Sequence, residues 1–578
     1  MENSKKFFTR KVCIGNVEIG QNNPIRIQSM TNTKTEDIEA TINQIMVLQD
    51  AGCEIVRVTA QGKKQAYALE IIKNNLIKKN YLIPIVADIH FYPPAAYIAA
   101  DFVEKIRINP GNFYEKKASS KAEISDYDYE KELKEIEENL FPLIEKLKKN
   151  KKALRIGVNH GSLSDRIMKK YGNTVNAMIQ SAVEYANICR KYDFHNLVFS
   201  MKTSSAFLTI QSNKALVEEM RKLKWDYPIH LGVTEAGDEE DGIIKSSIGI
   251  GSLLLEGIGD TIRFSLTEDP VKEIKPALKL VELCSKNKIS FIEKSKDPFF
   301  DKIKLAAVND EIISDKQFSM ADIFYLKNRA DIKEFERTKK PIIIKNNNVI
   351  GENIFSLSNI TDNDLENKNH YAIEISSNDD FEKLKKLSPS YIIYKPQENR
   401  IEELQKFNLF LNESNIKIPV IALLQYDQDF EQNRILASSE IGLIIFEKMA
   451  NAILLETKND SLNLALNIFQ ACDLKKFKPD YISCPGCGRT LFDIQTAVKK
   501  IKEKTSHLQN IKIAIMGCIV NGLGEMQDAD FGYVGSKPNK IDLYVKNQCI
   551  EKNIDEKEAV EKLISLIKLN NMWQEEKQ

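Results

Sequence analysis

Three cysteines in the last hundred residues have the types and spacing most suited to chemistry. Cys484 and Cys487 belong to the segment Cys-Pro-Gly-Cys-Gly, and Cys518 follows 31 residues after Cys487. Proline and glycine force a tight turn that points both sulfurs of such a knuckle inward, as in zinc ribbons, rubredoxin-type iron sites and iron–sulfur clusters. A redox-active CxxC pair is disfavoured because the segment does not open a helix after a strand. The spacing therefore predicts a metal centre.

The fourth ligand decides which metal this centre would hold. A zinc ribbon needs a second CxxC pair, whereas Cys518 stands alone and is followed by a glycine-containing loop that carries Glu525. Three thiolates with one carboxylate make an awkward structural zinc site. The same set suits a cluster in which one iron keeps a weak oxygen ligand that substrate can displace. The alternative is that Glu525 is an ordinary surface carboxylate.

A second group of polar residues follows the predicted strands of the first half of the chain. Five of eight successive strand ends carry Arg or Lys. In a parallel barrel these ends converge on one cavity, and Arg forks match phosphate oxygens, so the pattern predicts a site for a phosphorylated anion. The alternative is that polar residues simply mark strand ends. The residues are Gln28, Ser29, Arg57, Asp88, His90, Arg107, Asn109, Arg155, Asn159, Lys202, Thr234, Glu235, Arg263 and Ser265.

The elements that must position these residues alternate regularly through residues 1–284. Amphipathic segments such as Glu36–Gln49, Asn173–Cys189 and Lys214–Lys224 separate eight short β-branched runs. Eight strand–helix pairs over this length predict a (β/α)8 TIM barrel, although a doubly wound sheet shows the same alternation. The predicted strands are Pro24–Met30, Glu54–Thr59, Pro84–Ile89, Val103–Asn109, Leu154–Asn159, Asn196–Lys202, Ile229–Thr234 and Thr261–Leu266.

The chain is expected to have three domains: the barrel in 1–284, an inserted α/β spacer in 285–475 and a small α+β cluster domain in 476–578. The charged segment 114–152 predicts an enlarged loop and a long helix within the barrel. The middle domain holds one histidine, His370, and no polar group at its strand ends, so a spacer role is favoured. Its predicted strands are Pro341–Lys345, Tyr371–Ser376, Tyr391–Lys395, Pro419–Leu424 and Ile441–Phe446.

Composition narrows the class of protein. The 578 residues are 43% hydrophobic and 28% charged, which is a globular balance. Lys plus Arg and Asp plus Glu are both 82, so a general nucleic-acid binder is disfavoured. No apolar run is long enough to span a bilayer, and the first ten residues lack a secretory h-region. Nine cysteines are too few and odd in number for a disulfide scaffold, so a reducing, cytoplasmic location is expected.

Taken together, a cationic barrel mouth and an iron–sulfur domain predict a reductase acting on a phosphorylated small molecule. At these residues the chain resembles the 4-hydroxy-3-methylbut-2-enyl diphosphate synthases, iron–sulfur enzymes of the methylerythritol phosphate route to isoprenoid precursors. The resemblance rests on the knuckle and on segments 24–33, 56–59, 86–91, 106–112, 155–164, 232–237, 262–267 and 517–522. These segments lie in both end domains, in order. The middle domain resembles the insert of the long form by position and size.

The resemblance implies two-electron reductive ring opening and dehydration of 2-C-methyl-D-erythritol 2,4-cyclodiphosphate. It implies a 4Fe-4S cluster on Cys484, Cys487, Cys518 and Glu525, with reduced ferredoxin or flavodoxin as electron donor and a monomer or homodimer as the assembly. Glu235 is expected to be the general acid, and Asp88 and His90 to orient substrate or relay protons. Alternatively, His90 has a structural role only, and Glu235 is a structural partner of a neighbouring arginine. The expected phosphate-binding set is Arg57, Arg107, Asn109, Arg155, Asn159, Lys202, Arg263 and Ser265.

Two further expectations concern this long form. Leu523 stands where the family usually has proline, which should loosen the turn that presents Glu525, and Ser536 and Asn539 stand near positions where the family usually has glycine. The insert is expected to let the cluster domain fold back onto its own barrel.

Two rival functions remain open at this stage. One is a phosphate- or pterin-binding barrel transferase with a structural zinc domain. The other is a zinc-knuckle scaffold or nucleic-acid adaptor, for which the segment 476–540 lacks interleaved aromatic residues.

Overall fold

A computed structural model describes residues 7–114, 124–289, 303–308, 320–326, 342–344, 352–356, 371–458 and 460–575. The chain separates into two compact units. The first contains residues 7–253, 258–282 and 478 onward, and the second contains residues 254–257 and 283–477. The first unit consists of an eight-stranded parallel barrel and a five-stranded mixed sheet.

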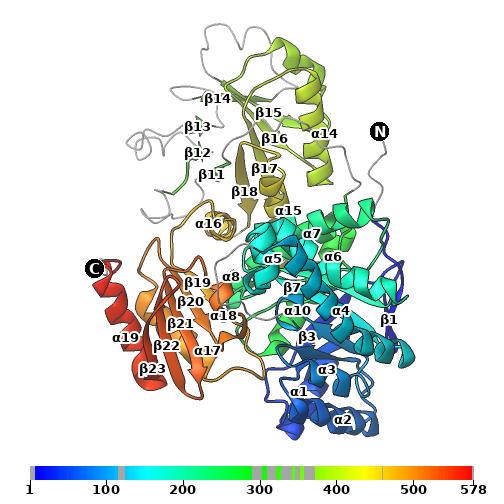
Figure 1. Cartoon of the computed structure of the whole chain (residues 1–578). Coiled ribbons are helices and arrows are strands. Elements are labelled where there is room, and N and C mark those ends of the chain that lie inside the picture. The colour runs from blue at the N-terminus through cyan, green and yellow to red at the C-terminus, as the bar shows by residue number, and fades with distance from the viewer. Residues whose placement is uncertain are drawn as a thin grey trace. The chain divides into compact units, whose positions relative to one another are not determined.

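The N-terminal half of the chain forms the predicted TIM barrel (Figure 1). Its strands follow the order β8-β7-β6-β5-β4-β3-β10-β9, and all pairs between them are parallel. A bridge from Phe199 of β8 to Ile229, next to β9, joins the two ends of the sheet. The strands are β3 (Arg26–Met30), β4 (Ile55–Thr59), β5 (Ile85–Ile89), β6 (Lys105–Ile108), β7 (Ala153–Asn159), β8 (Leu197–Lys202), β9 (His230–Leu231) and β10 (Thr261–Ile262).

One end of this barrel is closed by a short hairpin that the sequence patterns did not predict. Strands β1 (Val12–Ile14) and β2 (Val17–Ile19) pair antiparallel. Val12, Ile14 and Ile19 are buried in one apolar cluster with residues from the beginnings of four barrel strands: Ile55, Val86, Ala153 and Val198. The hairpin thus covers the apolar beginnings of these four strands, and the opposite, carboxyl end of the barrel carries the predicted polar residues.

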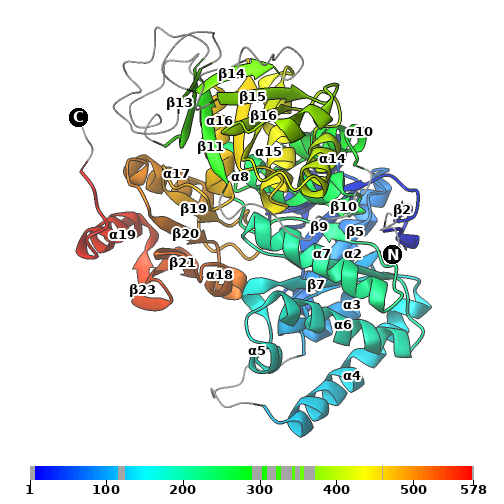
Figure 2. The same ribbon diagram turned by 90° about the horizontal axis from the view of Figure 1, so that it is seen from above.

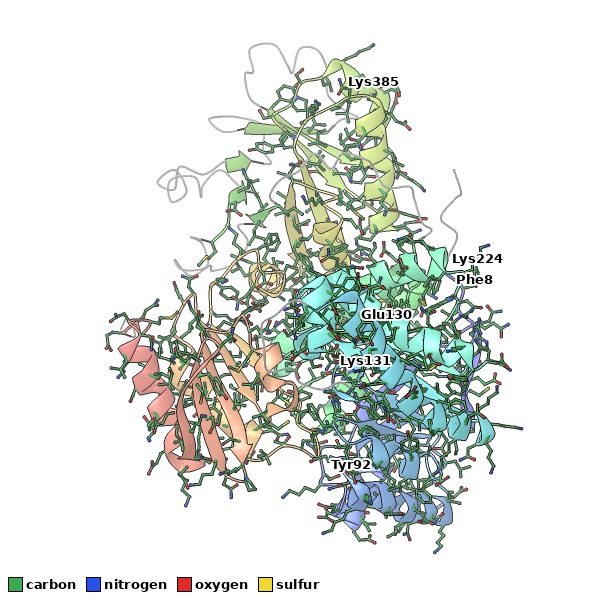
Figure 3. The ribbon with its side chains drawn as sticks, in the orientation of Figure 1. Phe8, Tyr92, Glu130, Lys131, Lys224 and Lys385 are labelled. Carbon is green, nitrogen blue, oxygen red and sulfur yellow. The ribbon has the colours of Figure 1, made fainter. Side chains whose placement is uncertain are left out.

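Helices surround the barrel strands, as Figure 2 shows from above. Several begin at side-chain caps, for example Thr174 before α6 and Ser205 before α7, each of which accepts a backbone N–H three residues later. The charged segment after β6 contains the predicted long helix, α4, on which Glu130 and Lys131 are exposed (Figure 3). The helices are α1 (Ile38–Asp50), α2 (Lys63–Lys78), α3 (Pro93–Ala99), α4 (Asp126–Lys149), α5 (Asp165–Tyr171), α6 (Val175–Lys191), α7 (Ala206–Lys222), α8 (Glu239–Ser246), α9 (Ser252–Leu255) and α10 (Ile274–Lys286).

The second unit contains another closed barrel of eight parallel strands. The sequence predicts an α/β domain here but not its closure, which depends on pairing between β18 and β11 across about 150 residues of chain. The strands are β11 (Lys304–Val308), β12 (Ile323–Leu326), β13 (Ile342–Ile344), β14 (Glu352–Ser356), β15 (Tyr371–Ser376), β16 (Tyr391–Lys395), β17 (Val420–Tyr426) and β18 (Ala452–Thr457). Helices α14 (Arg400–Glu413), α15 (Phe430–Phe446) and α16 (Ser461–Ala471) accompany the later strands.

One predicted strand of this domain is wrong. The run Ile441–Phe446 forms the last part of helix α15, and the strand follows it as β18. The run is buried on nearly all sides, and a helix that is apolar all round gives the same short β-branched pattern as a buried strand. Pro341, Lys345 and His370 lie outside the described residues.

The C-terminal domain is a sheet in the order β19-β20-β21-β22-β23, parallel over its first three strands and antiparallel over the last three. Along β20, Ile513 and Ile515 pack in the cluster with α17 and α19, whereas Ala514 and Met516 face the other side of the sheet. The elements are β19 (Asp480–Ser483), β20 (Lys512–Met516), β21 (Phe531–Lys537), β22 (Lys540–Val545), β23 (Gln548–Asp555), α17 (Ile494–Thr505), α18 (Ile519–Glu525) and α19 (Glu556–Leu569).

The segment after Cys518 is a short helix, α18, and not the predicted glycine loop. Leu523 lies inside this helix, and leucine is a good helix residue. The expected effect of Leu523 on the presentation of Glu525 stays a prediction. Asn539 adopts a left-handed backbone with φ of 57°, which asparagine tolerates better than most residues where a glycine would be usual.

Candidate active site

The carboxyl ends of the N-terminal barrel strands and the cysteine knuckle line one cavity. Most of the residues predicted for the site lie on it, whereas Gln28, Ser29, Asn109, Arg155 and Glu525 are buried outside its lining. From the barrel, the cavity is lined by Met30, Arg57, Asp88, His90, Arg107, Asn159, Lys202, Thr234, Glu235, Arg263 and Ser265. From the C-terminal domain, it is lined by Cys484, Pro485, Gly486, Cys487, Arg489, Met516, Cys518, Val520 and Gly522.

Asp88, at the end of β5, is the carboxylate around which the cations of the cavity gather. Its Oδ1 accepts from Arg107 Nη1 at 3.0 Å and lies 3.8 Å from Arg57 Nη1. Its Oδ2 accepts from Arg489 Nη2 at 3.0 Å. Burial opposes the charge, but Arg57 and Arg107 hold the pKa of the Asp88 carboxyl well below its usual range. Asp88 is therefore a fixed anion that orients arginines.

His90 has little capacity to carry a proton. Its Nε2 contacts Arg107 Nη1, and an arginine only donates, so Nε2 accepts in this contact. Its Nδ1 lies 3.0 Å from Asn112 Nδ2, the nitrogen of the side-chain amide. Burial, with the nearby arginines, lowers the pKa of His90 to about 3. The geometry favours orientation over proton relay.

Two glycines make room for the cations of the cavity. A Cβ on Gly157 of β7 would lie 2.6 Å from Arg107 Nε, and one on Gly232 would lie 2.5 Å from Lys202 Nζ. Arg107 uses this space to donate to the Gly157 carbonyl at 3.0 Å and to Asn159 Oδ1 at 3.2 Å. The β-strand sequence thus leaves space on one strand for a long side chain from its neighbour.

Three residues predicted to bind phosphate differ in the hydrogen-bond partners that they have within the protein. Arg263 is already engaged by Glu273, at 3.1 and 3.2 Å. Arg155 is fully buried, and none of its guanidinium nitrogens has a hydrogen-bond partner among the described residues. Asn109 caps the turn at 110–112 and donates to Ser162 at 2.7 Å, so its position in the structure is that of a loop support.

Glu235 and Glu525 bring two carboxyl groups together beside the thiols. Glu235 follows β9 with a left-handed φ of 47°, and its Oε2 is buried with no hydrogen-bond partner among the described residues. Thr234 Oγ1 donates to Glu525 Oε2 at 3.0 Å. Burial raises the pKa of Glu235, and burial together with the Glu235 charge raises that of Glu525 well above its usual value. Burial and the closeness of the two carboxyls thus both disfavour the charged forms.

The knuckle between β19 and α17 has the tight geometry that its sequence predicts. Gly486 has φ of 73°, a conformation open to glycine at little cost. Thr490 Oγ1 accepts from the Cys487 N–H at 2.9 Å, which fixes the loop. Cys518, the third cysteine of the site, is the N-cap residue of α18, so it lies at the positive end of the helix dipole. Burial raises the pKa of the Cys484 thiol well above its usual range and that of Cys518 to about 11.

The donor set of the cavity is compatible with a cluster. The ligands of an iron–sulfur cluster each bind a different iron, so they need not meet at one point as the ligands of a zinc ion do. Three thiols line the cavity, and the Glu525 carboxyl is buried beside it.

The C-terminal domain contacts the barrel mouth through backbone as well as side chains. Ser483 pairs with Ala236 in a parallel bridge, and its hydroxyl lies 2.6 Å from that of Thr267. Gly524 of α18 lies against Gly161 after β7 so closely that a Cβ on Gly524 would come within 1.5 Å of the Gly161 carbonyl oxygen. Since neither glycine has a side chain, the helix that carries Glu525 can approach the barrel at backbone distance.

Sequence reasoning missed several residues of the cavity. Arg489 follows the knuckle directly, and its position next to two cysteine ligands was an available signal. Met30 contacts Arg57 and Arg263 through its sulfur, at 3.1 and 3.5 Å. Glu273 comes from the helical segment after β10, where no motif marks it.

The fold and the cavity define a class: an α/β-barrel enzyme whose site is completed by a small cysteine-bearing domain. The GcpE TIM-barrel domain matches residues 9–278, and the GcpE protein C-terminal domain matches residues 480–569. The chain belongs to the 4-hydroxy-3-methylbut-2-en-1-yl diphosphate synthase (GcpE) family.

Relatives match the whole chain, including the insert. The 4-hydroxy-3-methylbut-2-en-1-yl diphosphate synthase (flavodoxin) of Protochlamydia amoebophila is 45% identical, over 98% of this chain and 96% of its own. The flavodoxin-named synthase of Chlamydia muridarum is 39% identical over 100% and 99%. The chloroplastic synthase (ferredoxin) of Oryza sativa is 37% identical over 98% and 87%.

Solved structures resemble the chain only distantly. An N-acetylneuraminic acid synthetase from Leptospira borgpetersenii aligns with a TM-score of 0.33 and 14% identity, over 49% of this chain and 93% of its own. No helix within the described residues is both long and apolar enough to cross a membrane.

Proposed function

We propose that this protein reduces 2-C-methyl-D-erythritol 2,4-cyclodiphosphate to 4-hydroxy-3-methylbut-2-enyl diphosphate. Two electrons and two protons enter, the ring C–O bond breaks, and one water leaves. The observation that carries the proposal is the cavity itself, which has four cations from barrel strand ends on one side and three thiols on the other. Cations bind a diphosphate, and thiols hold a group that delivers electrons.

We assign a 4Fe-4S cluster to Cys484, Cys487, Cys518 and Glu525. When bound, the cluster supplies single electrons and an iron that acts as a Lewis acid toward substrate oxygen. Glu525 suits the fourth position because a carboxylate is a weaker ligand for iron than a thiolate and exchanges for substrate more easily. The three thiols are only partly exposed, which limits access of water and oxygen.

The residues of the barrel have separable proposed roles. Arg57, Arg107 and Lys202 bind the diphosphate, with Arg155 and Arg263 as deeper members of the same set. Asn159 and Ser265 add neutral hydrogen bonds, and Asn109 supports the loop that carries Ser162. Asp88 and His90 hold the arginine forks in place.

Glu235 is the proposed proton donor to the leaving oxygen. Its carboxyl lines the cavity, one of its oxygens has no hydrogen-bond partner among the described residues, and burial raises its pKa. An acid with a raised pKa can donate at neutral pH, as general-acid catalysis requires.

The domains divide this work. Residues 1–284 bind substrate, residues 476–578 hold the cluster, and residues 285–475 serve as a spacer. Reduced flavodoxin or ferredoxin is the electron donor, in agreement with the names of the relatives. All nine cysteines are free thiols, which supports a reducing, cytoplasmic location.

The first test is elemental analysis of protein purified without oxygen. About four irons and four sulfides per chain, with brown absorbance and turnover of the cyclodiphosphate under a strong reductant, are expected. Stoichiometric zinc without colour, persisting after anaerobic reconstitution, would remove the electron path. That outcome would favour the alternative function, a phosphate- or pterin-binding transferase, which the names of the relatives do not support.

We further propose that the cluster domain works on the barrel of its own chain. The backbone contacts of Ser483 and Gly524 with the barrel support this. Mixing Cys518→Ser protein with Glu235→Gln protein tests it, because a site made within one chain cannot be restored by the mixture. Recovery of activity in the mixture would show donation between subunits and refute intramolecular closure.

A further inference from the structure

We propose that Arg489 sets the reduction potential of the cluster, by holding a fixed positive charge against Cys487, and that Asp88 keeps it there. The inference rests on the proposed function, because it assumes the cluster. It assigns a role to a residue that is neither a ligand nor a proposed phosphate-binding group. Arg489 is a positioning residue in this scheme, acting on the cluster through a cysteine.

Arg489 contacts both halves of the site. Its backbone N–H donates to Cys487 Sγ at 3.4 Å, and its Nη1 lies 3.8 Å from the same sulfur. Its Nη2 donates to the Asp88 carboxylate at 3.0 Å and to the Asp88 carbonyl at 3.3 Å. The side chain is buried, with 8% of its surface exposed. A single guanidinium thus joins the knuckle to the end of β5.

The physical effect of this arrangement has a definite sign. Reduction adds a negative charge to the cluster, and a nearby cation stabilises the reduced form more than the oxidised form. Hydrogen bonds to ligand sulfurs and local charge are the usual levers on cluster potentials. Because Arg489 is buried, solvent screens its charge little. Arg489 therefore raises the potential, which makes the cluster easier to reduce by a small electron carrier.

Asp88 opposes this effect electrostatically while it holds Arg489 in place. The same carboxylate also accepts from Arg107, a proposed phosphate-binding residue. The cluster side and the substrate side of the site therefore share one anchor. Asp88→Asn removes the negative charge but keeps a side-chain oxygen and the backbone carbonyl that accept from Arg489, so Arg489 should stay in place. The knuckle should then become more positive, and the two substitutions should move the potential in opposite directions.

The test is a redox titration of full-length, anaerobically reconstituted protein without substrate, followed by visible absorbance and by the EPR signal of the reduced cluster. Iron and sulfide are counted first in each sample. We compare wild type with Arg489→Gln, Arg489→Lys and Asp88→Asn. Lys502→Met is the matched control, because it removes an ion pair between the C-terminal domain and Asp238 that does not involve the knuckle.

We expect Arg489→Gln to lower the midpoint potential enough to change the oxidised-to-reduced ratio at least tenfold, which is about 59 mV for one electron. Arg489→Lys should lie between this variant and wild type, Asp88→Asn should shift upward, and Lys502→Met should match wild type. If Arg489→Gln fails to hold its cluster, the test rests on the potentials of Arg489→Lys and Asp88→Asn compared with wild type.

An unchanged potential in Arg489→Gln, or shifts of Arg489→Lys and Asp88→Asn in the same direction, would overturn the inference. Absence of iron and sulfide from wild type would instead refute the proposed function, so the two failures are distinguishable.

Discussion

Gly524→Ala should separate the cluster helix from the barrel without unfolding either. The new Cβ would lie 1.5 Å from the Gly161 carbonyl oxygen, a distance that real Cβ atoms do not adopt. Reaching even 3.0 Å requires α18 and the barrel turn to move apart by about 1.5 Å. The obstacle is backbone on both sides, so no side-chain rotation can relieve it. Within the helix, alanine is about 1 kcal/mol more favourable than glycine.

The expected loss follows from this displacement. A misplacement of about 1 Å between reacting groups can cost about 100-fold in rate. Gly524→Ala should therefore reduce kcat by about 100-fold or more, which corresponds to about 2.7 kcal/mol of transition-state free energy. Iron and sulfide content should stay near wild type, because the three cysteines are untouched. The assay is single-turnover oxidation of pre-reduced enzyme by the cyclodiphosphate, with cluster absorbance as the signal.

Gly522→Ala is the matched control in the same helix. Its new Cβ would meet side chains and no backbone: Met516 at 3.0 and 3.2 Å and Val534 at 3.7 Å. This variant should lose less than tenfold in rate. Gly524→Ala protein with a full cluster and a rate within threefold of wild type would refute the claim that α18 lies against Gly161 during turnover.

Three further predictions test individual residues. Glu235→Gln should keep its iron and sulfide and lose about 100- to 10,000-fold in kcat, measured with a chemical reductant, and an unaffected rate would exclude Glu235 as the acid. Arg155→Met should raise the Tm of the substrate-free protein, because it removes a buried cation without a partner, while weakening cyclodiphosphate binding; a lower Tm would show that Arg155 is compensated. The lowered pKa of Asp88 means that its stabilisation is present above the usual aspartate pKa of about 3.9 and is lost as pH falls below it. The Tm difference between wild type and Asp88→Asn should therefore be constant from pH 8 to pH 5 and shrink only below about pH 4, and an earlier decline would contradict the ion-pair assignment.

Much of the barrel could be predicted because its signals are local. Each of the eight predicted strand runs overlaps an observed strand, although β9 and β10 are only two residues long. Alternation along parallel strands then placed Arg57, Asp88 and Arg107 at one end, because strand direction alone fixes which end they share. The hairpin β1–β2 was missed because three-residue strands carry too little periodicity.

The parts that sequence could not supply depend on contacts between distant segments. Arg489 and Asp88 are 401 residues apart, and no local pattern relates them. Closure of the second barrel depends equally on long-range pairing. The sequence also does not predict which arginines find a carboxylate. Arg263 pairs with Glu273, whereas the Arg155 guanidinium has no hydrogen-bond partner among the described residues.

The excess of positive charge around the cavity fits an anionic ligand. Lys202 and Arg155 are buried beside other cations, and burial with this repulsion lowers both pKa values well below the usual range. Arg155 also has no hydrogen-bond partner for its guanidinium among the described residues. An arrangement of this kind destabilises the empty protein, since buried like charges are costly. A diphosphate in the cavity would bring negative charge close to both cations, so free energy stored in the empty site would become binding free energy.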